Sequence, residues 1–498
     1  MTARELALEV LTRVEEDRAF AGLLLDHHLN RSGLSARDRR LATELTYGVL
    51  RWGGRLDAYL RRTSHRPLAG LPSWLRNLLR LGAYQCLFLD RIPPYAAVHE
   101  SVTLAKARGH EGIALFVNAV LRAVIRHGKL LEEPQDPLEA LAVRHSFPLW
   151  LVRRWVGRYG AEEAETLMTA LNQRPPFTIR VNTLRLTREE MILHLKSEGA
   201  EASPTPYAPE GLILDTPLLP DSSPSFREGL WTVQDEASIL VGHLLAPRPG
   251  ERVLDLCAAP GGKTTHLAQL MENRGLIVGV DPHAGRLELA REACRRLGVE
   301  IVELVLGQAQ TLSRHASFDR VLVDAPCSNL GILRRAPELK WSRQEEELPR
   351  LSATQVEILE AAAALVRPGG VIVYSTCSLE PEENEAVVTA LLTRHPEFTP
   401  DPPEPDEPAT PLTGESCVFR AFPHLHGTDG FTAFRLQHAE EPSCKAEASR
   451  ARALPAQARG EVRPLGGVAR LERRVRETRR GTEEGGEAPL RDLKGGLT

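Results

Sequence analysis

Two cysteines follow apolar runs that read as β-strands, and both lie in short, turn-prone segments. Cys327 lies in DAPCS (324–328), and Cys377 lies in STCS (375–378). A buried cysteine is usually an inert apolar residue, but a thiol close to positive charge can ionise and act as a nucleophile. Lys263 is the candidate source of that charge. The residues alone therefore leave both roles open, core packing or nucleophilic chemistry.

A thiolate beside a nucleoside cofactor would suit methylation of a pyrimidine at carbon. Cytosine C5 is a poor nucleophile, but addition of sulfur to C6 breaks the aromaticity and puts negative charge on C5. C5 can then take a methyl group from a sulfonium, so that covalent catalysis divides one hard step into easier ones. A second base or thiol must help to remove the C5 proton. Asp324 could hydrogen-bond the N3–N4 edge of the base and stabilise charge there.

The stretch 253–265, VLDLCAAPGGKTT, predicts a cofactor-binding turn. Residues 253–257 read as a buried strand, 258–262 as a turn of small residues, and 263–270 as a helix. This geometry directs backbone N–H groups and the positive end of a helix dipole at an anionic or polar ligand. The next apolar strand ends at Asp281, whose carboxylate can accept hydrogen bonds from both ribose hydroxyls. We therefore expect a nucleotide-like cofactor.

Two other cofactor classes fit the turn less well. Gly262-Lys263-Thr264 resembles the end of a P-loop, but that motif needs a glycine where Cys257 stands. An NAD-binding turn reads G-x-G-x-x-G, whereas this turn reads A-x-P-G-G. A P-loop NTPase would hydrolyse ATP with Mg²⁺ held by Asp324, and it remains the alternative from another enzyme class.

Length and composition indicate a soluble protein of several domains. The chain has 498 residues, is 42% hydrophobic and 26% charged, and carries a net charge of −4. Apolar runs are too short to cross a bilayer, and the N-terminus MTARELALEV lacks the apolar region of a signal peptide. We expect a cytoplasmic protein. Seven cysteines, odd in number and without a C-x-x-C pair, favour neither disulfides nor a metal site.

Residues 1–130 show helical periodicity throughout and carry an excess of positive charge. They contain 20 Lys and Arg against 12 Asp and Glu, although the whole chain is acidic. Eight arginines of this region are close in sequence: Arg37, Arg39, Arg40, Arg51, Arg55, Arg61, Arg62 and Arg66. Such a face is either solvated surface or a binding surface for phosphates.

The rest of the chain divides into three regions after the linker 132–137. Residues 140–240 predict a small α+β subdomain with strands at 177–182 and 211–214. Residues 241–437 alternate strands and helices, which is typical of a doubly wound, Rossmann-like α/β sheet. Asp255, Asp281, Asp324 and Cys377 all fall at strand ends, so we expect them to converge. Residues 438–498 contain no aromatic residue and predict a disordered tail.

Several segments of the chain resemble known families. The segments ARELALEVLTRVEEDRAFAGLLLD, RDRRLATELTYGVLRW and IPPYAAVHESVTLAKARG resemble the NusB-type antitermination domain, an all-helical RNA-binding module. LDLCAAPGGKTTHLAQLM, VDAPCSNLGILRRAPELKW, YSTCSLEPEENEAVV and HGTDGFTAFRL resemble the Sun-type RNA 5-methylcytosine methyltransferases, which use S-adenosylmethionine. The two resemblances together imply a bacterial enzyme that methylates cytosine C5 in 16S ribosomal RNA, with another RNA such as tRNA as the alternative substrate.

The resemblance also implies residue roles. Cys377 would be the nucleophile, Cys327 would aid product release, and Asp324 and Lys263 would complete the catalytic group. The predicted cofactor-binding residues are Cys257, Ala258, Ala259, Pro260, Gly261, Gly262, Lys263, Asp281, Gln308 and Asp324. The expected partner is small-subunit ribosomal RNA, and we expect a monomer without metal and without membrane association.

Two positions depart from the family pattern. Gln308 stands where the family usually has aspartate in G-D-A, so cofactor affinity could differ while the reaction type is kept. Asn329 stands where the family has the glycine of PCSG. Asparagine tolerates the left-handed backbone conformation, so we expect the loop to keep its shape. From the residues alone, a non-catalytic RNA-binding factor and a methyltransferase acting on protein or small molecules remain alternatives.

Overall fold

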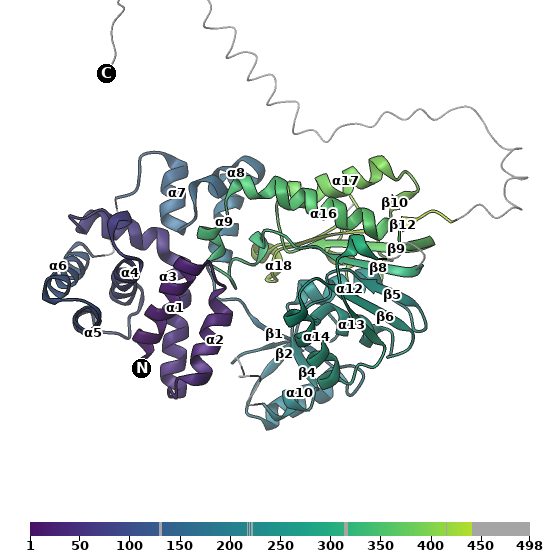
Figure 1. The fold of residues 1–498 in the computed structure, drawn as a ribbon, viewed down its shortest axis with the longest axis horizontal. Coiled ribbons are helices and arrows are strands. Elements are labelled where there is room, and N and C mark those ends of the chain that lie inside the picture. The colour runs from purple at the N-terminus through teal and green to yellow at the C-terminus, as the bar shows by residue number, and fades with distance from the viewer. Residues whose placement is uncertain are drawn as a thin grey trace, which may run out of the picture. The chain divides into compact units, whose positions relative to one another are not determined.

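The computed structural model describes residues 1–128, 132–216, 218, 220, 223–312, 317–414 and 416–440 (Figure 1). Residues 1–440 form one compact unit. The predicted tail 438–498 lies outside the described residues from 441 onward, and its first residue, His438, still belongs to a strand. Within the described ranges, no helix is both long and apolar enough to span a membrane.

Residues 1–127 form a helical bundle, as the periodicity predicts. Its helices are α1 (Ala3–Asp17), α2 (Ala21–Arg31), α3 (Ala36–Thr63), α4 (Ser73–Phe88), α5 (Pro94–Arg108) and α6 (Glu111–His127). The side chains of Thr2 and Glu5 form a capping box that fixes the start of α1. Leucines on the inner faces, including Leu45, Leu78 and Leu121, pack into one core and are fully buried.

Three further helices connect the bundle to the rest of the chain, and Figure 1 shows them between the bundle and the large sheet. These helices are α7 (Pro137–His145), α8 (Leu149–Tyr159) and α9 (Ala161–Leu171). Their apolar faces, with Trp155 at the centre, pack on Leu330, Leu333 and Leu379 from the loops that carry the two cysteines. The helices therefore support the loops of the candidate site from behind.

Residues 177–233 form a small antiparallel sheet with strand order β2-β3-β1-β4. Its elements are β1 (Phe177–Val181), α10 (Arg188–Ser197), β2 (Ala202–Pro204), β3 (Gly211–Leu214), α11 (Pro224–Arg227) and β4 (Trp231–Val233). Strands β1 and β3 agree with the two strands that the sequence predicts for this α+β region.

The large sheet has eight strands in the order β10-β12-β9-β8-β5-β6-β7, with β11 paired to β12. Its strands are β5 (Arg252–Asp255), β6 (Leu276–Asp281), β7 (Val302–Leu306), β8 (Phe318–Asp324), β9 (Val366–Thr376), β10 (Phe398–Pro400), β11 (Val418–Ala421) and β12 (Phe431–His438). The strands from β9 to β7 run parallel, and β12 pairs antiparallel with β9. Strands β11 and β12 form an antiparallel pair at the edge of this region.

Helices cover both faces of this sheet, which confirms the doubly wound fold class. They are α12 (Glu236–Leu245), α13 (Gly262–Leu270), α14 (Ala284–Leu297), α16 (Leu348–Ala363) and α17 (Glu385–Arg394). The short helices α15 (Leu339–Ser342) and α18 (Pro423–His426) pack toward α7–α9 instead. Val253 on β5 faces the core beneath α12 and α13, whereas its neighbour Leu254 faces the core beneath α16 and α17. This alternation is the period-two pattern of a strand buried on both sides.

Hydrogen bonds join the helical bundle to residues 338–341, which follow Cys327 along the chain. Trp341 donates its indole N–H to the Leu50 carbonyl at 2.9 Å, and Ala21 donates its backbone N–H to Glu338 at 3.0 Å. Arg51 and Arg55 belong to the arginine cluster of the first domain. They donate hydrogen bonds to the backbone carbonyls of Arg334 and Arg144. These two arginines therefore bind backbone carbonyls of other segments, which is neither of the two roles that the sequence left open for the arginine cluster.

Candidate active site

The predicted strand ends converge at one edge of the large sheet. Asp255, Asp281, Asp324 and Thr376 end β5, β6, β8 and β9, and Cys377 follows Thr376 directly. The strand order reverses between β5 and β8, and a doubly wound sheet forms its ligand crevice at such a point. The crevice therefore lies where the sequence placed its candidate residues.

The two cysteines are in direct contact. The Sγ atoms of Cys327 and Cys377 lie 3.3 Å apart, and both thiols are free. Cys377 donates to the side-chain oxygen of Asn329 at 2.8 Å. Asn329 has a φ of +62°, so the left-handed conformation expected for this departure from the family pattern is present. Its contact with the nucleophile candidate is new, because sequence reasoning considered only the backbone of Asn329.

The surroundings of Cys377 favour the protonated thiol over the thiolate. The hydrogen bond with Cys327 and burial raise the pKa of Cys377 well above its usual value, and Asp324 acts in the same direction. Lys263 lowers this pKa, as the sequence suggested, but its effect is the smaller one. Activation of Cys377 therefore requires that its proton leave when substrate binds.

Lys263 and Asp324 form an ion pair beside the two thiols. Lys263 Nζ lies 2.8 Å from one oxygen of Asp324 and 4.9 Å from the centroid of the Phe431 ring. Ser375 donates its hydroxyl to the other Asp324 oxygen at 2.9 Å. Both carboxylate oxygens are therefore held in place, which fixes the orientation of Asp324 toward the crevice.

A buried glutamate joins the two cysteine loops. Glu383 is fully buried and accepts hydrogen bonds from the hydroxyls of Ser328 and Ser378, the residues that follow Cys327 and Cys377. It also accepts from the backbone N–H of Ser328 at 2.7 Å. The spacing of the two thiols thus depends on Glu383. Sequence reasoning missed this residue, and its only signal was a carboxylate six positions after the second cysteine.

The cofactor turn has the shape that the sequence predicts. Residues 256–261 connect β5 to α13, and Gly261 adopts a φ of +100°. A Cβ atom on Gly261 would lie 2.9 Å from Ala290 Cα, so only glycine fits there. Thr264 donates its hydroxyl to Asp255 at 2.7 Å and closes the turn. Burial raises the pKa of the Cys257 thiol.

Asp281 and Gln308 lie beside this turn. Asp281 pairs with Leu306 at the end of β7, and Gln308 follows two residues later. One oxygen of Asp281 accepts the backbone N–H of His283 at 2.9 Å, and the other lies 3.9 Å from Arg286. The structure therefore brings Asp281, Gln308 and the turn to one part of the crevice, where they could hold a nucleoside.

The small α+β subdomain anchors the helix that begins at this turn. Arg180 on β1 is fully buried and donates to the Gly262 carbonyl at 2.7 Å and to the Thr265 hydroxyl at 2.9 Å. These contacts place the subdomain in direct support of the cofactor helix α13. Sequence reasoning assigned no role to Arg180.

Glu210, His243 and His266 form a second anchor of α13. Both histidines hold their Nε2 atoms against the Glu210 carboxylate, with His243 at 3.0 Å. Their ligand atoms lie within 4.8 Å of one another, so the group has the composition of a metal site. Because each Nε2 already faces a carboxylate oxygen, we interpret the group as a hydrogen-bonded clamp. The expected lack of a metal remains a prediction.

The fold and the crevice define the class of protein. A parallel sheet with the reversal between β5 and β8, an antiparallel strand beside β9, and a nucleoside crevice at the strand ends together describe a Rossmann-like methyltransferase.

Comparison with known proteins then gives the family. The family model described as 16S rRNA methyltransferase RsmB/F matches residues 242–437, and its ferredoxin-like domain matches residues 147–219. The NusB family model matches residues 1–126. The chain is 38% identical to the probable ribosomal RNA small subunit methyltransferase B of Bacillus subtilis strain 168, over 86% of this chain and 97% of that one. The chain belongs to the RsmB/F family of 16S rRNA methyltransferases.

Solved structures agree with this assignment. The structure titled PH0851 has a TM-score of 0.75 and 31% identity, and the match covers 89% of this chain and 99% of that one. The structure of NSun6 from Pyrococcus horikoshii with SFG has a TM-score of 0.53 and 27% identity, and covers 60% of this chain and all of that one. The predicted methyltransferase fold and the NusB-type domain are therefore confirmed.

Proposed function

We propose that this chain transfers a methyl group from S-adenosylmethionine to C5 of a cytosine in small-subunit ribosomal RNA, through a covalent adduct between Cys377 and C6. The observation that carries the proposal is the contact of two free thiols, 3.3 Å apart, beside the Lys263–Asp324 ion pair. Methyltransferases that act on oxygen or nitrogen need no such pair of thiols. The family membership favours this reaction over the hydrolysis of ATP by a P-loop enzyme.

The residues around the turn fit S-adenosylmethionine. Asp281 is 98% buried and can accept hydrogen bonds from ribose hydroxyls, and the glycine turn leaves room for backbone to approach the ligand. NSun6, a protein of similar fold, was solved with SFG, an analogue of S-adenosylmethionine. When bound, S-adenosylmethionine supplies a methyl group on a positively charged sulfur.

The two cysteines and Asp324 would divide the chemistry between them. Cys377 and Cys327 would each give their proton to solvent, and the Cys377 sulfur forms a bond to C6, which leaves the electron pair on C5. C5 forms a bond to the methyl group, and S-adenosylhomocysteine remains. The thiolate of Cys327 then accepts the C5 proton, the bond between C6 and Cys377 breaks, and the double bond of the ring is restored. Asp324 would hydrogen-bond the base edge and stabilise charge in the ring.

Substitution of each cysteine tests the order of these steps. A serine at position 377 is a far weaker nucleophile, so Cys377→Ser should abolish methylation and form no covalent species. Cys327→Ser should form the adduct and accept the methyl group but fail to release the RNA. A denaturing gel with labelled RNA should therefore show a protein–RNA band for Cys327→Ser that depends on S-adenosylmethionine. The double variant should lose this band.

Wild type and the three variants together form the control set. A trapped band in Cys377→Ser but not in Cys327→Ser would reverse the two roles. If no variant traps RNA while wild type forms 5-methylcytosine, the covalent mechanism is wrong. If wild type methylates tRNA but not small-subunit ribosomal RNA, the substrate is wrong and the chemistry stands.

The remaining parts of the proposal follow from the substrate. An enzyme of ribosomal RNA would work in the cytoplasm, and the helical bundle, which matches the NusB family, would contribute to RNA binding. The relatives named small subunit methyltransferase B support ribosomal RNA rather than tRNA as the substrate. We propose that one copy of the chain suffices, because the described residues assemble the crevice within a single chain.

A further inference from the structure

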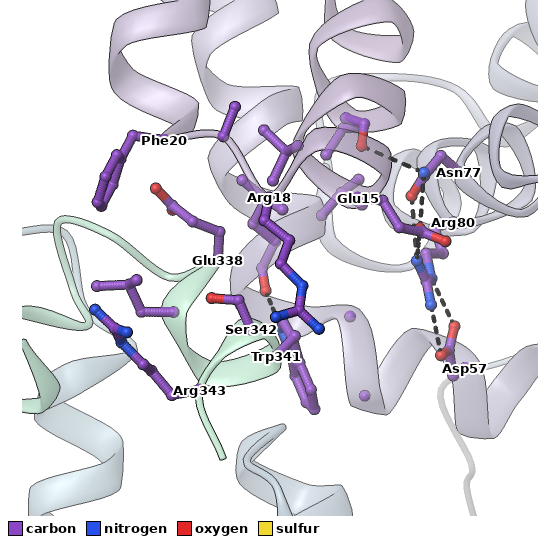
Figure 2. A pocket seen from close by; sticks show the side chains of 18 of the residues that line it. Glu15, Arg18, Phe20, Asp57, Asn77, Arg80, Glu338, Trp341, Ser342 and Arg343 are labelled. Atoms are coloured by element: carbon purple, nitrogen blue, oxygen red, sulfur yellow. Dashed lines mark hydrogen bonds and ion pairs between the residues drawn. The ribbon is translucent and has the colours of Figure 1, made fainter. Parts of the chain in front are cut away.

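A cavity of about 460 Å³ lies between the helical bundle and the segment that follows Cys327 (Figure 2). The bundle contributes residues from α1, the α1–α2 loop, α3 and α4, and the catalytic part contributes residues 338–347. A volume of this size accommodates a small organic ligand or one nucleotide. The cavity is distinct from the crevice that holds the thiols, and the proposed chemistry leaves it without a role.

Part of the cavity wall is a closed network of charges. Arg80 donates to Asp57 at 2.7 and 2.8 Å and to Glu15 at 2.9 Å, and Glu15 also accepts from Asn77 at 3.0 Å. Figure 2 shows these residues grouped on one side. Because they satisfy one another, this side of the cavity needs no ligand.

The side next to the catalytic part differs, because Glu338 is incompletely satisfied. Glu338 is 94% buried, and its Oε1 accepts the backbone N–H of Ala21. Its Oε2 is buried and has no hydrogen-bond partner among the described residues. A buried acceptor without a donor is costly, so a ligand with an N–H group would stabilise this oxygen. The N–H groups on the pairing edges of nucleobases are donors of this kind.

Two aromatic side chains in the cavity wall are unusually exposed. Phe20 is 49% exposed and Trp341 is 42% exposed. In Figure 2, Glu338 lies between these two rings. The hydrogen bond from Trp341 to the Leu50 carbonyl holds its ring in a fixed orientation, so little side-chain freedom is lost when a base stacks on it. Exposed aromatic rings that stack on bases are the common feature of sites for single-stranded nucleic acid.

A free positive charge completes the cavity. Arg18, at the end of α1, is exposed and makes no hydrogen bond or ion pair with another described residue. Figure 2 shows its guanidinium group extending into the space beside Trp341. A guanidinium without a carboxylate partner is suited to a phosphate group.

The cavity is mechanically connected to the thiols. Arg343 lines the cavity and donates its Nε to the carbonyl of Ser328 at 3.0 Å, and Ser328 follows Cys327. The segment that carries Glu338, Trp341 and Arg343 is thus the continuation of the cysteine loop. An RNA strand bound in the cavity would be held by the same segment that presents the thiol.

We propose that this cavity binds one unpaired nucleotide of the RNA substrate, other than the target cytosine. The base contacts Phe20 and Trp341, an N–H group of its pairing edge donates to Glu338, and its phosphate pairs with Arg18. This proposal rests on the proposed RNA substrate. It makes the seam between the helical bundle and the catalytic part a second recognition site, which adds sequence or shape selectivity to the chemistry.

The test compares RNA affinity and methylation kinetics of full-length variants. Phe20→Ala and Trp341→Ala should each raise the Kd for small-subunit ribosomal RNA about tenfold, because each removes one stacking surface. Glu338→Gln should also weaken binding, because its amide nitrogen would face the N–H group of the base. Arg18→Gln should reduce the slope of log K against log salt by about 0.7. In all four variants the affinity for S-adenosylmethionine, measured by calorimetry, should match wild type.

Tyr95→Ala is the matched control, since Tyr95 is a 78% exposed aromatic residue of the same bundle outside the cavity. The melting temperature of each variant shows whether weaker RNA binding comes from lost RNA contacts or from weaker packing between the bundle and residues 338–347. Glu338→Gln conserves the shape of the side chain, so it tests the cavity even if a substitution to alanine destabilises the fold. If the four variants bind RNA as tightly as Tyr95→Ala, the cavity proposal is wrong. The cavity proposal is also wrong if the four variants bind naked RNA normally and lose affinity only for ribosomal particles, since that pattern would indicate a protein partner. If wild type forms no 5-methylcytosine, the proposed function fails independently of these measurements.

Discussion

Substitution of Asn329 should change the reactivity of Cys377. The side-chain oxygen of Asn329 accepts a hydrogen bond from the Cys377 thiol at 2.8 Å, and this contact stabilises the protonated form. Asn329→Gly removes the oxygen but suits the backbone, because glycine adopts the φ of +62° without strain. We therefore expect the variant to keep the loop and to make the thiol easier to ionise.

The magnitude follows from the strength of one hydrogen bond. Such a bond between neutral groups contributes about 0.5–1.5 kcal/mol. Since one pKa unit corresponds to about 1.4 kcal/mol, the pKa of Cys377 should fall by roughly 0.4–1 unit. The thiolate is the reactive form, so the rate of alkylation below this pKa should rise about threefold to tenfold.

The assay is alkylation by iodoacetamide at pH 8, with mass spectrometry of the peptide that contains Cys377. Asn329→Asp is the control with the opposite sign, because a carboxylate beside the sulfur disfavours the thiolate and should slow the reaction. Slower alkylation in Asn329→Gly would refute the reasoning, since it would mean that the Asn329 amide presents its N–H₂ group to the sulfur and stabilises the thiolate.

Three further predictions concern the cofactor turn and its support. Gly261→Ala should reduce the affinity for S-adenosylmethionine at least tenfold and lower the melting temperature, because the new Cβ would lie 2.9 Å from Ala290 Cα; a normal calorimetric titration would contradict the assigned turn. Asp281→Ala should lower the same affinity at least tenfold through the loss of ribose hydrogen bonds while the fold survives, and an unchanged Kd would remove Asp281 from the site. Burial lowers the pKa of His266 from its ordinary 6.5 to about 4. As the pH falls, the imidazole is therefore protonated in the unfolded chain before it is protonated in the folded protein. The free energy of unfolding should fall as the pH drops from about 6.5 to 4. His266→Gln should flatten that part of a melting-temperature profile, and an unaltered profile would show that other groups cause the loss.

The contact between the two cysteines shows where sequence reasoning stopped. The sequence placed Cys327 and Cys377 after two strands of one sheet, which predicts the same edge but not a contact. The contact depends on register, because Asp324 pairs with Ser375 and the chain then continues on both strands into the two loops. A shift of one residue in this register would direct the side chains to opposite faces.

The supporting residues could not be found from local patterns. Glu383 contacts serines from two loops that are 50 residues apart in the chain, and Arg180 reaches the cofactor helix from a different sheet. Glu383 lies in the segment YSTCSLEPEENEAVV, but nothing in that segment distinguishes it from the neighbouring glutamates, and Arg180 lies in none of the segments that carry the resemblance. Their burial, and therefore their role, exists only after the domains have packed together.

The arginines of the helical bundle look alike in the sequence but have different roles in the structure. The cluster of arginines left a solvated face and a phosphate-binding face open, but Arg51 and Arg55 donate to backbone carbonyls at the seam. Arg18, outside that cluster, lines the cavity and pairs with no other described residue. Charge counted along a chain does not distinguish these cases, because long side chains reach partners that only the tertiary structure provides.

The sequence by itself determined the α/β class, the helical first domain, the glycine turn at 257–263 and the placement of Cys327 and Cys377 after two strands of one sheet. These features depend on local rules, namely the period of apolar residues, the turn chemistry of glycine and proline, and motifs whose spacing is fixed along one strand and one helix. The tertiary structure alone decided the contact of the thiols, the partners of Asp324 and Glu383, and the cavity at the seam. Those features require segments that are distant in sequence to meet at distances near 3 Å, and only the packing of the cores sets that geometry.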